Sequence, residues 1–474
     1  MPSLLDGVPL FGQRFHIQAT LFAYAAPHCK VAVLVQSFRR QMRLRLTCVT
    51  LAVLAGPTSA QLSPPPTQEF RVVYSRVIEP PIFASDAPTH SNIFTVDTGL
   101  PIENQITEDN KSFSPVPSPD GSKIAFIRLD PETCEGCLIA ARYNLAVMNV
   151  DGSELHVVQP LSSNFPWFKW SPDGKFLLFF RWFPLADATR KNSGEIHLFL
   201  ISVDSSTEPI DIGPTEAFSE SWSPDGKWIA FGRPLVGKRN LNESKLCVVS
   251  SAAPKDVTVV DGTWNRAAYS WSPDGSALAY FKNDGHSHSL VVARPFGNGT
   301  QSLASVHQVL SRPVWSPEGT RLLFADQEHG KTALYKIALD GSTPLRITDP
   351  KLQARDPLWS PDGERIAFLS YSHDRSKVYV AHADGSDPRP VGLNKSVKND
   401  LCSPRSWLPD SQRLIVGCNS QIQTPFIFDP PRDRAPTLFL TYPFDSSLPP
   451  VQLTKAGSGF VSFASVVPIA VAIR

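Results

Sequence analysis

Short runs of apolar and β-branched residues alternate with polar turns along most of the chain, and their order is regular. Between residues 355 and 391, four such runs follow one another, and P-D-G and D-G-S turns follow the first and the third. Proline presets φ in a turn, Asp bonds back to the local backbone, and Gly accepts the left-handed region. The pattern therefore predicts four antiparallel strands joined by tight turns, at residues 356–360, 365–369, 377–382 and 389–392.

This unit recurs seven times along the chain, and each copy carries the string W-S-P-D-G or a near version of it. The acidic residue of each copy follows the previous one by 44 to 53 residues. A period of about 40–50 residues, filled with short strands, is the signature of a β-propeller, in which each unit forms one four-stranded blade. The seven acidic positions are Asp120, Asp173, Asp225, Asp274, Glu318, Asp362 and Asp410.

Six of the seven copies begin with tryptophan, and the first has Pro117 instead. A large ring at this position can fill the wedge between two neighbouring sheets. A carbohydrate-stacking platform is the other reading. A residue repeated in nearly every blade indicates repeated architecture, so we expect the tryptophans to pack between blades.

The two ends of the repeat array decide how many blades there are. Strand-like runs remain after the seventh unit at 459–465 and 468–474, and before the first unit at 70–77 and 92–107. The last of these ranges reads as the outer two strands of a blade without its inner two. Joining both chain ends in one sheet removes free edges. We expect an all-β propeller of eight four-stranded antiparallel blades, seven complete repeats plus one shared by the termini; seven blades is the alternative.

The first 68 residues lie outside the repeats. Residues 42–60 have a basic start, an apolar core and small residues up to Ala60, as a secretory signal peptide does. Residues 1–41 would then be a non-native upstream extension, 61–68 a Pro-rich linker and 69–474 the propeller. The alternatives are a long N-region or a membrane anchor, but the apolar core is short of the roughly 20 residues that span a bilayer. We expect an exported, periplasmic or extracellular protein, without an integral membrane segment after cleavage near Ala60.

The balance of charged residues bears on which class of partner the protein can bind. Lys plus Arg is 45 and Asp plus Glu is 44, so no basic stripe is available for counterion-driven nucleic-acid binding. No motif calls for a cofactor, and we expect a monomer.

Two pairs of cysteines stand out in the propeller region. Cys402 and Cys418 flank a Pro-Asp turn almost symmetrically, so antiparallel pairing should bring them opposite each other within about one residue, as a disulfide requires. Cys134 and Cys137 form a lone C-x-x-C, which indicates a local disulfide or free thiols instead of a zinc site.

With these motifs in place, the array resembles the WD40-like repeats of the TolB propeller family. The matching features are W-S-P-D-G, the I-A-F strand that follows it at 124–126, 229–231 and 366–368, and the D-G-S turn. The resemblance implies a propeller, and for TolB itself a periplasmic binding protein with an α/β domain before the propeller. The short stretch between the linker and the first motif leaves no room for that domain, so the chain is expected to differ from TolB itself.

A second resemblance, to oligogalacturonide lyases, implies a metal held by histidines. Four histidines follow the tryptophan of their own unit by 14 to 17 residues, on three consecutive blades. A metal would need two or three imidazoles about 2 Å from one ion, whereas sheets stand roughly 10 Å apart. We therefore favour no metal site and read these residues as polar turn residues. The candidates, if a metal binds, are His286, His288, His329 and His373.

The segments that lead into the first strand of each blade differ between blades, and these strands are expected to line a central channel. Their mixed charges suit a peptide or small ligand; simple solvated side chains are the alternative reading. The pattern predicts a non-catalytic propeller that binds a protein, peptide or glycan through one channel face, and the alternative is a metal-assisted polysaccharide lyase or hydrolase. The candidate ligand-binding residues at the channel mouth are Trp167, Lys169, Glu216, Glu220, Arg266, Arg312, Arg355, Asp356 and Arg405.

Overall fold

The computed structural model divides the chain into two compact units, Met1–Pro64 and Pro65–Arg474. In the first unit, β1 (Phe22–Ala26) and β2 (Cys29–Val33) form an antiparallel hairpin. The ranges predicted as signal peptide and linker lie outside the described residues. The structure describes residues 22–26, 29–33, 70–77, 91–97, 102–130, 142–161, 167–184, 194–204, 207–216, 220–234, 244–264, 269–283, 287–295, 299–372, 375–393, 401–419, 437–445, 448–453 and 461–468.

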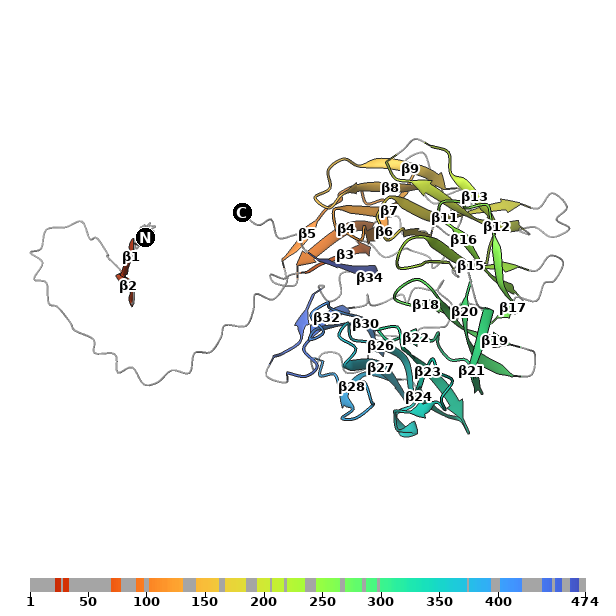
Figure 1. Ribbon diagram of the computed structural model, residues 1–474. Coiled ribbons are helices and arrows are strands. Elements are labelled where there is room, and N and C mark those ends of the chain that lie inside the picture. The colour runs from red at the N-terminus through yellow and green to blue at the C-terminus, as the bar shows by residue number, and fades with distance from the viewer. Residues whose placement is uncertain are drawn as a thin grey trace, which may run out of the picture. The chain divides into compact units, whose positions relative to one another are not determined.

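Within the second unit, the described strands form eight four-stranded antiparallel sheets arranged in a ring (Figure 1). The prediction of an eight-bladed, all-β propeller is confirmed. We number blades 1 to 7 by their W-S-P-D-G copy, and name the eighth sheet the closing blade. The first strands of neighbouring blades contact one another, as β22, β26 and β30 do, so they form the inner wall of the ring.

The strands of the seven numbered blades follow in chain order. They are β6 (Ser112–Pro117), β7 (Lys123–Leu129), β8 (Tyr143–Asn149) and β9 (His156–Leu161) in blade 1; β10 (Phe168–Trp170), β11 (Phe176–Pro184), β12 (Gly194–Ser202) and β13 (Ile210–Pro214) in blade 2; β14 (Ser221–Trp222), β15 (Trp228–Pro234), β16 (Ser244–Ser250) and β17 (Thr258–Trp264) in blade 3; β18 (Tyr269–Trp271), β19 (Leu278–Asn283), β20 (His288–Arg294) and β21 (Gly299–Val306) in blade 4; β22 (Val314–Trp315), β23 (Arg321–Glu328), β24 (Lys331–Ala338) and β25 (Leu345–Arg346) in blade 5; β26 (Ala354–Trp359), β27 (Arg365–Ser372), β28 (Arg375–His382) and β29 (Arg389–Pro390) in blade 6; and β30 (Leu401–Trp407), β31 (Leu414–Asn419), β32 (Thr437–Thr441) and β33 (Val451–Gln452) in blade 7.

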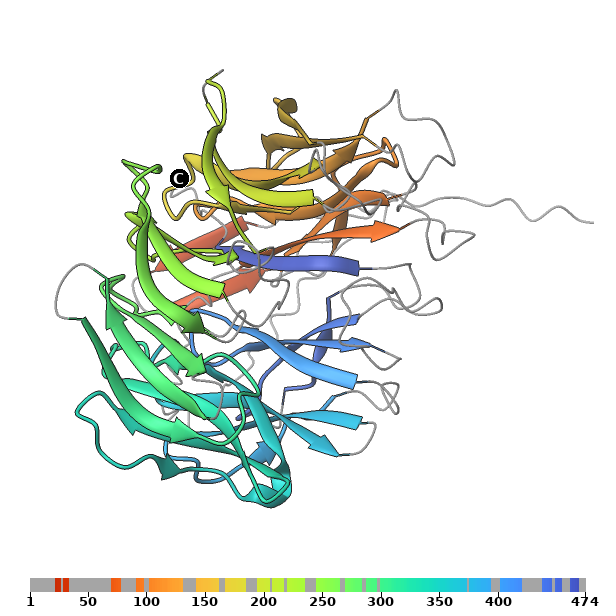
Figure 2. The same cartoon turned by 90° about the vertical axis from the view of Figure 1, so that its right-hand side faces the viewer.

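The closing blade joins the two ends of the propeller in the order β34-β3-β4-β5. Its inner strand β34 (Val461–Pro468) is C-terminal, and β3 (Phe70–Val77), β4 (Ser91–Asp97) and β5 (Glu103–Gln105) are N-terminal (Figure 2). The sequence correctly predicted a shared blade, but the division is three strands to one. The C-terminal run expected at 459–465 corresponds to β34, and the run expected at 468–474 lies outside the described residues except for Pro468.

The repeated turn has the geometry that its residues predict. The turn glycines have positive φ, for example 72° at both Gly275 and Gly363. In the fourth copy, the Ser272 hydroxyl donates to Asp274 Oδ1 at 2.5 Å, and this bond together with those from Ser276 holds the pKa of the Asp274 carboxyl below its usual range. The carboxylate of this turn is therefore held by the turn's own hydrogen-bond donors, and its role is local and structural.

The tryptophans pack between blades, as predicted. Each of the six is nearly buried, between 5% and 8% exposed. In four blades the indole N–H donates to a backbone carbonyl on the inner strand of the preceding blade, whereas Trp222 Nε1 and Trp359 Nε1 are buried without a hydrogen-bond partner among the described residues. The four bonds are Trp170 to Val116 at 2.9 Å, Trp271 to Ser221 at 3.4 Å, Trp315 to Ser270 at 3.1 Å and Trp407 to Leu358 at 3.3 Å.

The hydrophobic core is divided into layers between neighbouring blades. One layer packs Leu178 and Phe180 of blade 2 against Trp222 and Phe231 of blade 3. The closing blade has such a layer on each side, toward blade 7 and toward blade 1. Burial at these interfaces therefore closes the ring. Among the described residues, no helix is long and apolar enough to cross a membrane.

Candidate functional site

The candidate site is the inner wall, because its side chains differ from blade to blade while the rest of the blade repeats. In blade 2, Lys169 lies on β10 between the buried Phe168 and Trp170. Trp167 just precedes this strand, is half-buried, and stacks on Phe180 with ring centroids 4.5 Å apart. The stack fixes Trp167 against its own blade.

Charges from several blades act on one another at this wall. The surface of the Lys169 side chain is accessible to water, but many protein atoms surround it. This partial loss of solvation is the main factor that lowers the pKa of Lys169. The positive charge of Arg312, which precedes β22 of blade 5, lowers that pKa further, and the negative charge of Glu220, which precedes β14 of blade 3, raises it. Since blades 2 and 5 are not neighbours in the ring, these charges interact across its inner side.

Two buried carboxylates lie in the segment that leads into blade 3. Glu216 and Glu220 are 7% and 5% exposed. The Thr215 hydroxyl lies 3.0 Å from Glu220 Oε1 and donates to it, and the backbone N–H of Glu216 donates to Gly232 at 2.8 Å. The negative charge of Glu220 also acts on Tyr269, whose pKa is raised mainly by burial. These contacts join the predicted carboxylates to the wall of blades 3 and 4.

Blade 6 contributes two adjacent charged residues at an irregularity of its inner strand. The register between β26 and β27 shifts between Arg355 and Leu358, and Asp356 within this bulge has a φ of 52°. Bulges and left-handed non-glycine residues are enriched where a side chain is re-aimed at a functional site. Burial raises the pKa of the Asp356 carboxyl, and the charges of Arg355 and Arg312 lower it.

The Arg355 side chain is held by an aromatic ring. Its guanidinium carbon lies 4.3 Å from the centroid of the Tyr371 ring, a cation–π contact. Its Nε atom is buried and has no hydrogen-bond partner among the described residues. Within the described part of the chain, this N–H is therefore left without an acceptor.

Blade 7 carries Arg405 at another register shift, between Pro404 and Ser406 of β30. Burial lowers the pKa of Arg405 although its side chain is open to water, as at Lys169. A Cβ at Gly417 of β31 would lie 2.6 Å from Arg405 Nε, so the arginine lies directly over this glycine. A glycine inside a strand commonly marks such a close approach.

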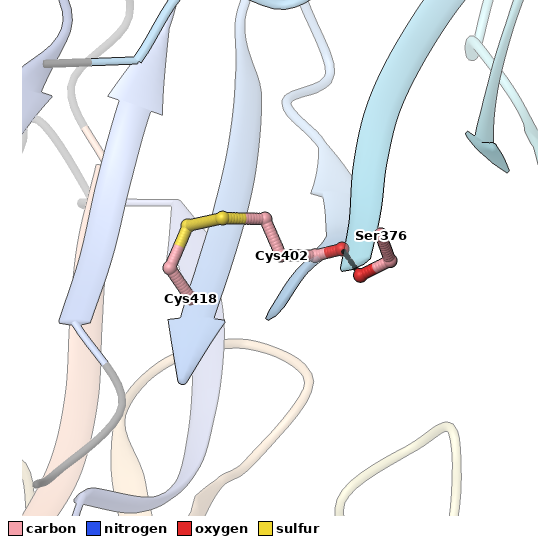
Figure 3. Close-up of a disulfide and its surroundings, with 3 residues drawn as sticks. All are labelled: Ser376, Cys402 and Cys418. Carbon is pink, nitrogen blue, oxygen red and sulfur yellow. Dashed lines mark hydrogen bonds between the residues drawn. A yellow bond between two sulfur atoms is a disulfide. The ribbon is translucent and has the colours of Figure 1, made fainter. Parts of the chain in front are cut away.

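A disulfide fixes the hairpin that bears Arg405 (Figure 3). Cys402 of β30 pairs with Cys418 of β31 in the strand register and is bonded to it. The Ser376 hydroxyl of blade 6 donates to the Cys402 carbonyl at 2.8 Å and ties the same strand to its neighbour. The sequence had placed these cysteines opposite each other, and the structure has them so.

The two described candidate histidines, His288 and His329, lie on outer parts of their blades. His288 begins β20 of blade 4, and His329 lies in the β23–β24 turn of blade 5 with its side chain 91% exposed. Within the ranges that the structure describes, no three or more His, Cys, Asp or Glu side chains gather in a metal-binding arrangement. The predicted residues that fall outside the described ranges are Cys134, Cys137, Arg266, His286 and His373.

Sequence reasoning missed two residues that shape the wall, Tyr371 and Gly417. The glycine interrupts an otherwise apolar strand, which was a usable signal. Prolines gave another, because Pro115, Pro357 and Pro404 each lie in an inner strand whose register shifts. Proline has no N–H to give to a ladder and is confined to edges and bulges. Nothing in the sequence indicated Tyr371.

Comparison with known proteins agrees with this architecture. The family model for the TolB β-propeller domain matches residues 235–430. No curated protein sequence matches the chain. A solved structure titled as the eukaryotic initiation factor is similar in fold, with 12% identity, a TM-score of 0.51, and coverage of 85% of this chain and 99% of that one.

Two further solved structures match less closely. A putative TolB from Agrobacterium tumefaciens has 22% identity and a TM-score of 0.34, with coverage of 50% of this chain and 83% of that one. An oligogalacturonate lyase in complex with manganese has 17% identity and a TM-score of 0.43, with coverage of 66% of this chain and 90% of that one. These likenesses concern the fold alone.

Proposed function

Because this chain is a β-propeller of the TolB repeat type, we propose that it is a non-catalytic binding protein whose ligand contacts the inner wall. The ligand is a protein, a peptide or a glycan. The observation that carries the proposal is the mutual influence of charges from separate blades, Lys169, Glu220 and Arg312 above all.

Physical cost supports a binding role for these residues. Two like charges in a place partly removed from water raise the free energy of the free protein. Lys169 and Arg312 are such a pair, since the positive charge of Arg312 lowers the pKa of Lys169. Residues that cost stability in the free protein are characteristic of sites that meet a ligand.

Partner capture tests the proposal. The full chain serves as bait for exported proteins and cell-surface glycans of its source, beside a Lys169→Ala/Arg312→Ala variant. A Lys175→Ala/Lys227→Ala variant is the matched control, since both lysines directly follow W-S-P-D-G turns and their side chains are 71% and 74% exposed. We expect the wild type to capture one partner in stoichiometric amount. The control should capture as much of it, and the inner-wall variant at least tenfold less. A partner that both variants retain would contradict the proposal.

The second candidate function is metal-assisted cleavage of an acidic polysaccharide, motivated by the position of His329 in a turn with a φ of 51°. Incubation with polygalacturonate and manganese, followed by ultraviolet absorbance of an unsaturated product, measures this activity. Turnover that is lost in a His329→Ala variant would replace the binding proposal with an enzymatic one.

We also propose that the protein is exported, on the basis of the basic start and apolar core within residues 42–60. A disulfide between Cys402 and Cys418 fits an oxidising compartment. N-terminal sequencing of the mature protein tests the proposal: a start at Gln61 supports it, and an intact Met1 refutes it.

A further inference from the structure

We propose that an open cavity on the outer half of blade 5 binds the carboxylate of a small polar ligand. The cavity has a volume of about 420 Å³, which is near the lower end of the roughly 300–1,000 Å³ of ligand pockets. In the sheet order β22-β23-β24-β25, strand β24 lies third from the inner wall, and it forms the floor of the cavity. The site is therefore separate from the inner wall, and the inference goes beyond the binding function proposed above.

One face of β24 supplies the floor. Lys331, Ala333 and Tyr335 alternate along the strand, so their side chains lie on the same face. Ala333 is buried, and the half-buried Tyr335 ring stacks on Phe324 of β23 with ring centroids 5.7 Å apart. Burial is the main factor that raises the pKa of Tyr335, so its hydroxyl stays protonated at neutral pH and can donate a hydrogen bond.

Arg346 distinguishes this floor from the equivalent place in blade 6. The Phe–Tyr stack recurs there as Phe368 and Tyr379, again with centroids 5.7 Å apart, so the stack belongs to the repeated architecture. In the strand register, Arg346 lies opposite Tyr335. The residue opposite Tyr379 is Pro390. Blade 5 therefore has a cation where blade 6 has an uncharged residue.

Another wall of the cavity is η2 (Pro350–Leu352), a 3-10 turn between β25 and β26 that carries Lys351. The Asp349 Oδ1 atom accepts a hydrogen bond from the Lys351 backbone N–H at 2.9 Å and closes this turn. The backbone N–H of Thr332 donates to Gln353 Oε1 at 3.2 Å, which ties η2 to the floor strand. These bonds form within the protein itself, so the wall is in place before a ligand arrives, and less ordering is needed on binding.

The charges of the cavity suit one negative group. The three cations of its lining are Lys331, Arg346 and Lys351. All three are exposed, and none of them has an ion-pair partner among the described residues. The two carboxylates of the lining have local contacts, since Glu328 Oε1 lies 3.7 Å from His329 Nδ1 and Asp349 accepts from η2. With His329 neutral, three positive and two negative charges leave one positive charge, which a single carboxylate neutralises.

A carboxylate with hydrogen-bond donors beside it matches this lining. It can accept two parallel N–H bonds from the planar Arg346 guanidinium and a further bond from the Tyr335 hydroxyl. Glu328 and Asp349 can accept hydroxyl or N–H groups from the rest of the ligand. A phosphate brings a charge of about −1.5 to −2 and few donors, so the two wall carboxylates disfavour it. A sugar acid and the C-terminal end of a peptide both have the required chemistry.

Isothermal titration of the full chain at pH 7 tests the inference and separates these two sources. The probes are glucuronate, with glucose as its neutral counterpart, and N-acetyl-glycyl-alanine, with the corresponding C-terminal amide. Inorganic phosphate tests charge alone. The variants are Arg346→Gln and Lys331→Gln, and the matched control is Arg389→Gln on β29, the outer strand of blade 6, where the arginine side chain is 54% exposed.

We expect at least one carboxylate probe to bind the wild type at one site per chain, and its neutral counterpart to bind about tenfold more weakly or less. The probe that binds identifies the source of the carboxylate. Arg346→Gln and Lys331→Gln should each weaken this binding about tenfold, because each removes one cation of the lining, and Arg389→Gln should leave it unchanged. The thermal unfolding midpoint should not change in any of the three, because these side chains are exposed.

The inference is overturned if the wild type binds neither carboxylate, binds a carboxylate and its neutral counterpart equally, or binds phosphate more tightly. Binding that survives both Arg346→Gln and Lys331→Gln would overturn it as well. If Arg346→Gln also lowers the unfolding midpoint, Lys351→Gln decides the matter, and unchanged affinity in that variant counts against the site. The Lys169→Ala/Arg312→Ala variant should keep the carboxylate bound, so a failure here and a failure of the inner-wall function can be told apart.

Discussion

Replacement of a single inter-blade tryptophan by phenylalanine should cost different amounts in different blades. Trp170 is 5% exposed, and its Nε1 donates to the Val116 carbonyl of blade 1 at 2.9 Å. Trp359 is 8% exposed, and its Nε1 has no described partner. Both substitutions leave a void where the second ring was, which costs about 1–2 kcal/mol. Only Trp170→Phe also loses a hydrogen bond, which costs about 1 kcal/mol more.

In blade 6 the same substitution removes a buried donor that has no acceptor, and this relieves about 1 kcal/mol. We therefore expect a loss of about 2–3 kcal/mol for Trp170→Phe and about 0–1 kcal/mol for Trp359→Phe. Urea unfolding followed by far-ultraviolet circular dichroism, with the slope against denaturant compared between variants, gives both numbers. Equal losses, or a greater loss at Trp359, would refute the claim that the indole bond contributes to the interface.

Three further changes have definite outcomes. Reduction of the Cys402–Cys418 disulfide, or Cys402→Ser with Cys418→Ser, opens a loop with a separation of 16 residues and should cost about 3 kcal/mol in urea unfolding; an unchanged midpoint would contradict this. Gly319→Ala should lower the free energy of unfolding by about 1–2 kcal/mol, because a residue with a Cβ is strained at a φ of 73°. A steric clash adds nothing, since the nearest atom to the new Cβ, Pro273 Cδ, would lie 3.5 Å away. The bond from Asp326 raises the pKa of His307 above its ordinary 6.5, so the ion pair stabilises the fold fully below that pH and the contribution is lost as pH rises through the raised value. Wild type and His307→Gln should accordingly differ in thermal midpoint most at pH 5.5, and a difference that grows with pH would contradict the assignment.

The fold could be predicted from the sequence because one turn sequence occurs seven times along the chain. Pro361, Asp362 and Gly363 each favour the same local geometry for an independent reason, and their copies repeat it at blade spacing. The closing blade has no such turn, so the expectation of a shared sheet was sound but the share of each terminus was not. Residues 70–77 supply the second strand, and only residues 461–468 come from the other end.

The residues of the inner wall could be predicted in outline, because they differ from blade to blade whereas the turns and tryptophans repeat. Lys169, Arg312 and Asp356 stand where other blades have other residues, and the structure brings the charge of Arg312 within reach of both Lys169 and Asp356. The direction of Asp356 was not predictable, because a bulge in its strand shifts the register by one residue and reverses which side chain faces inward. The contact between Arg355 and Tyr371 depends on that shift, and hydrophobic pattern alone does not encode it. That these residues bind a ligand stays a prediction.

The closing blade, with three N-terminal strands and one C-terminal strand, has a consequence for folding during synthesis. A ribosome delivers β3, β4 and β5 first and β34 last, after all seven numbered blades. Until β34 emerges, the inner edge of β3 lacks its partner strand, and unpaired strand edges invite association with other chains. The inner edge of β3 thus stays unpaired for almost the whole of translation, and the ring closes only at its end. Mistranslation or proteolysis near residues 461–468 would leave the other seven blades intact but the edge of β3 unpaired and prone to aggregation.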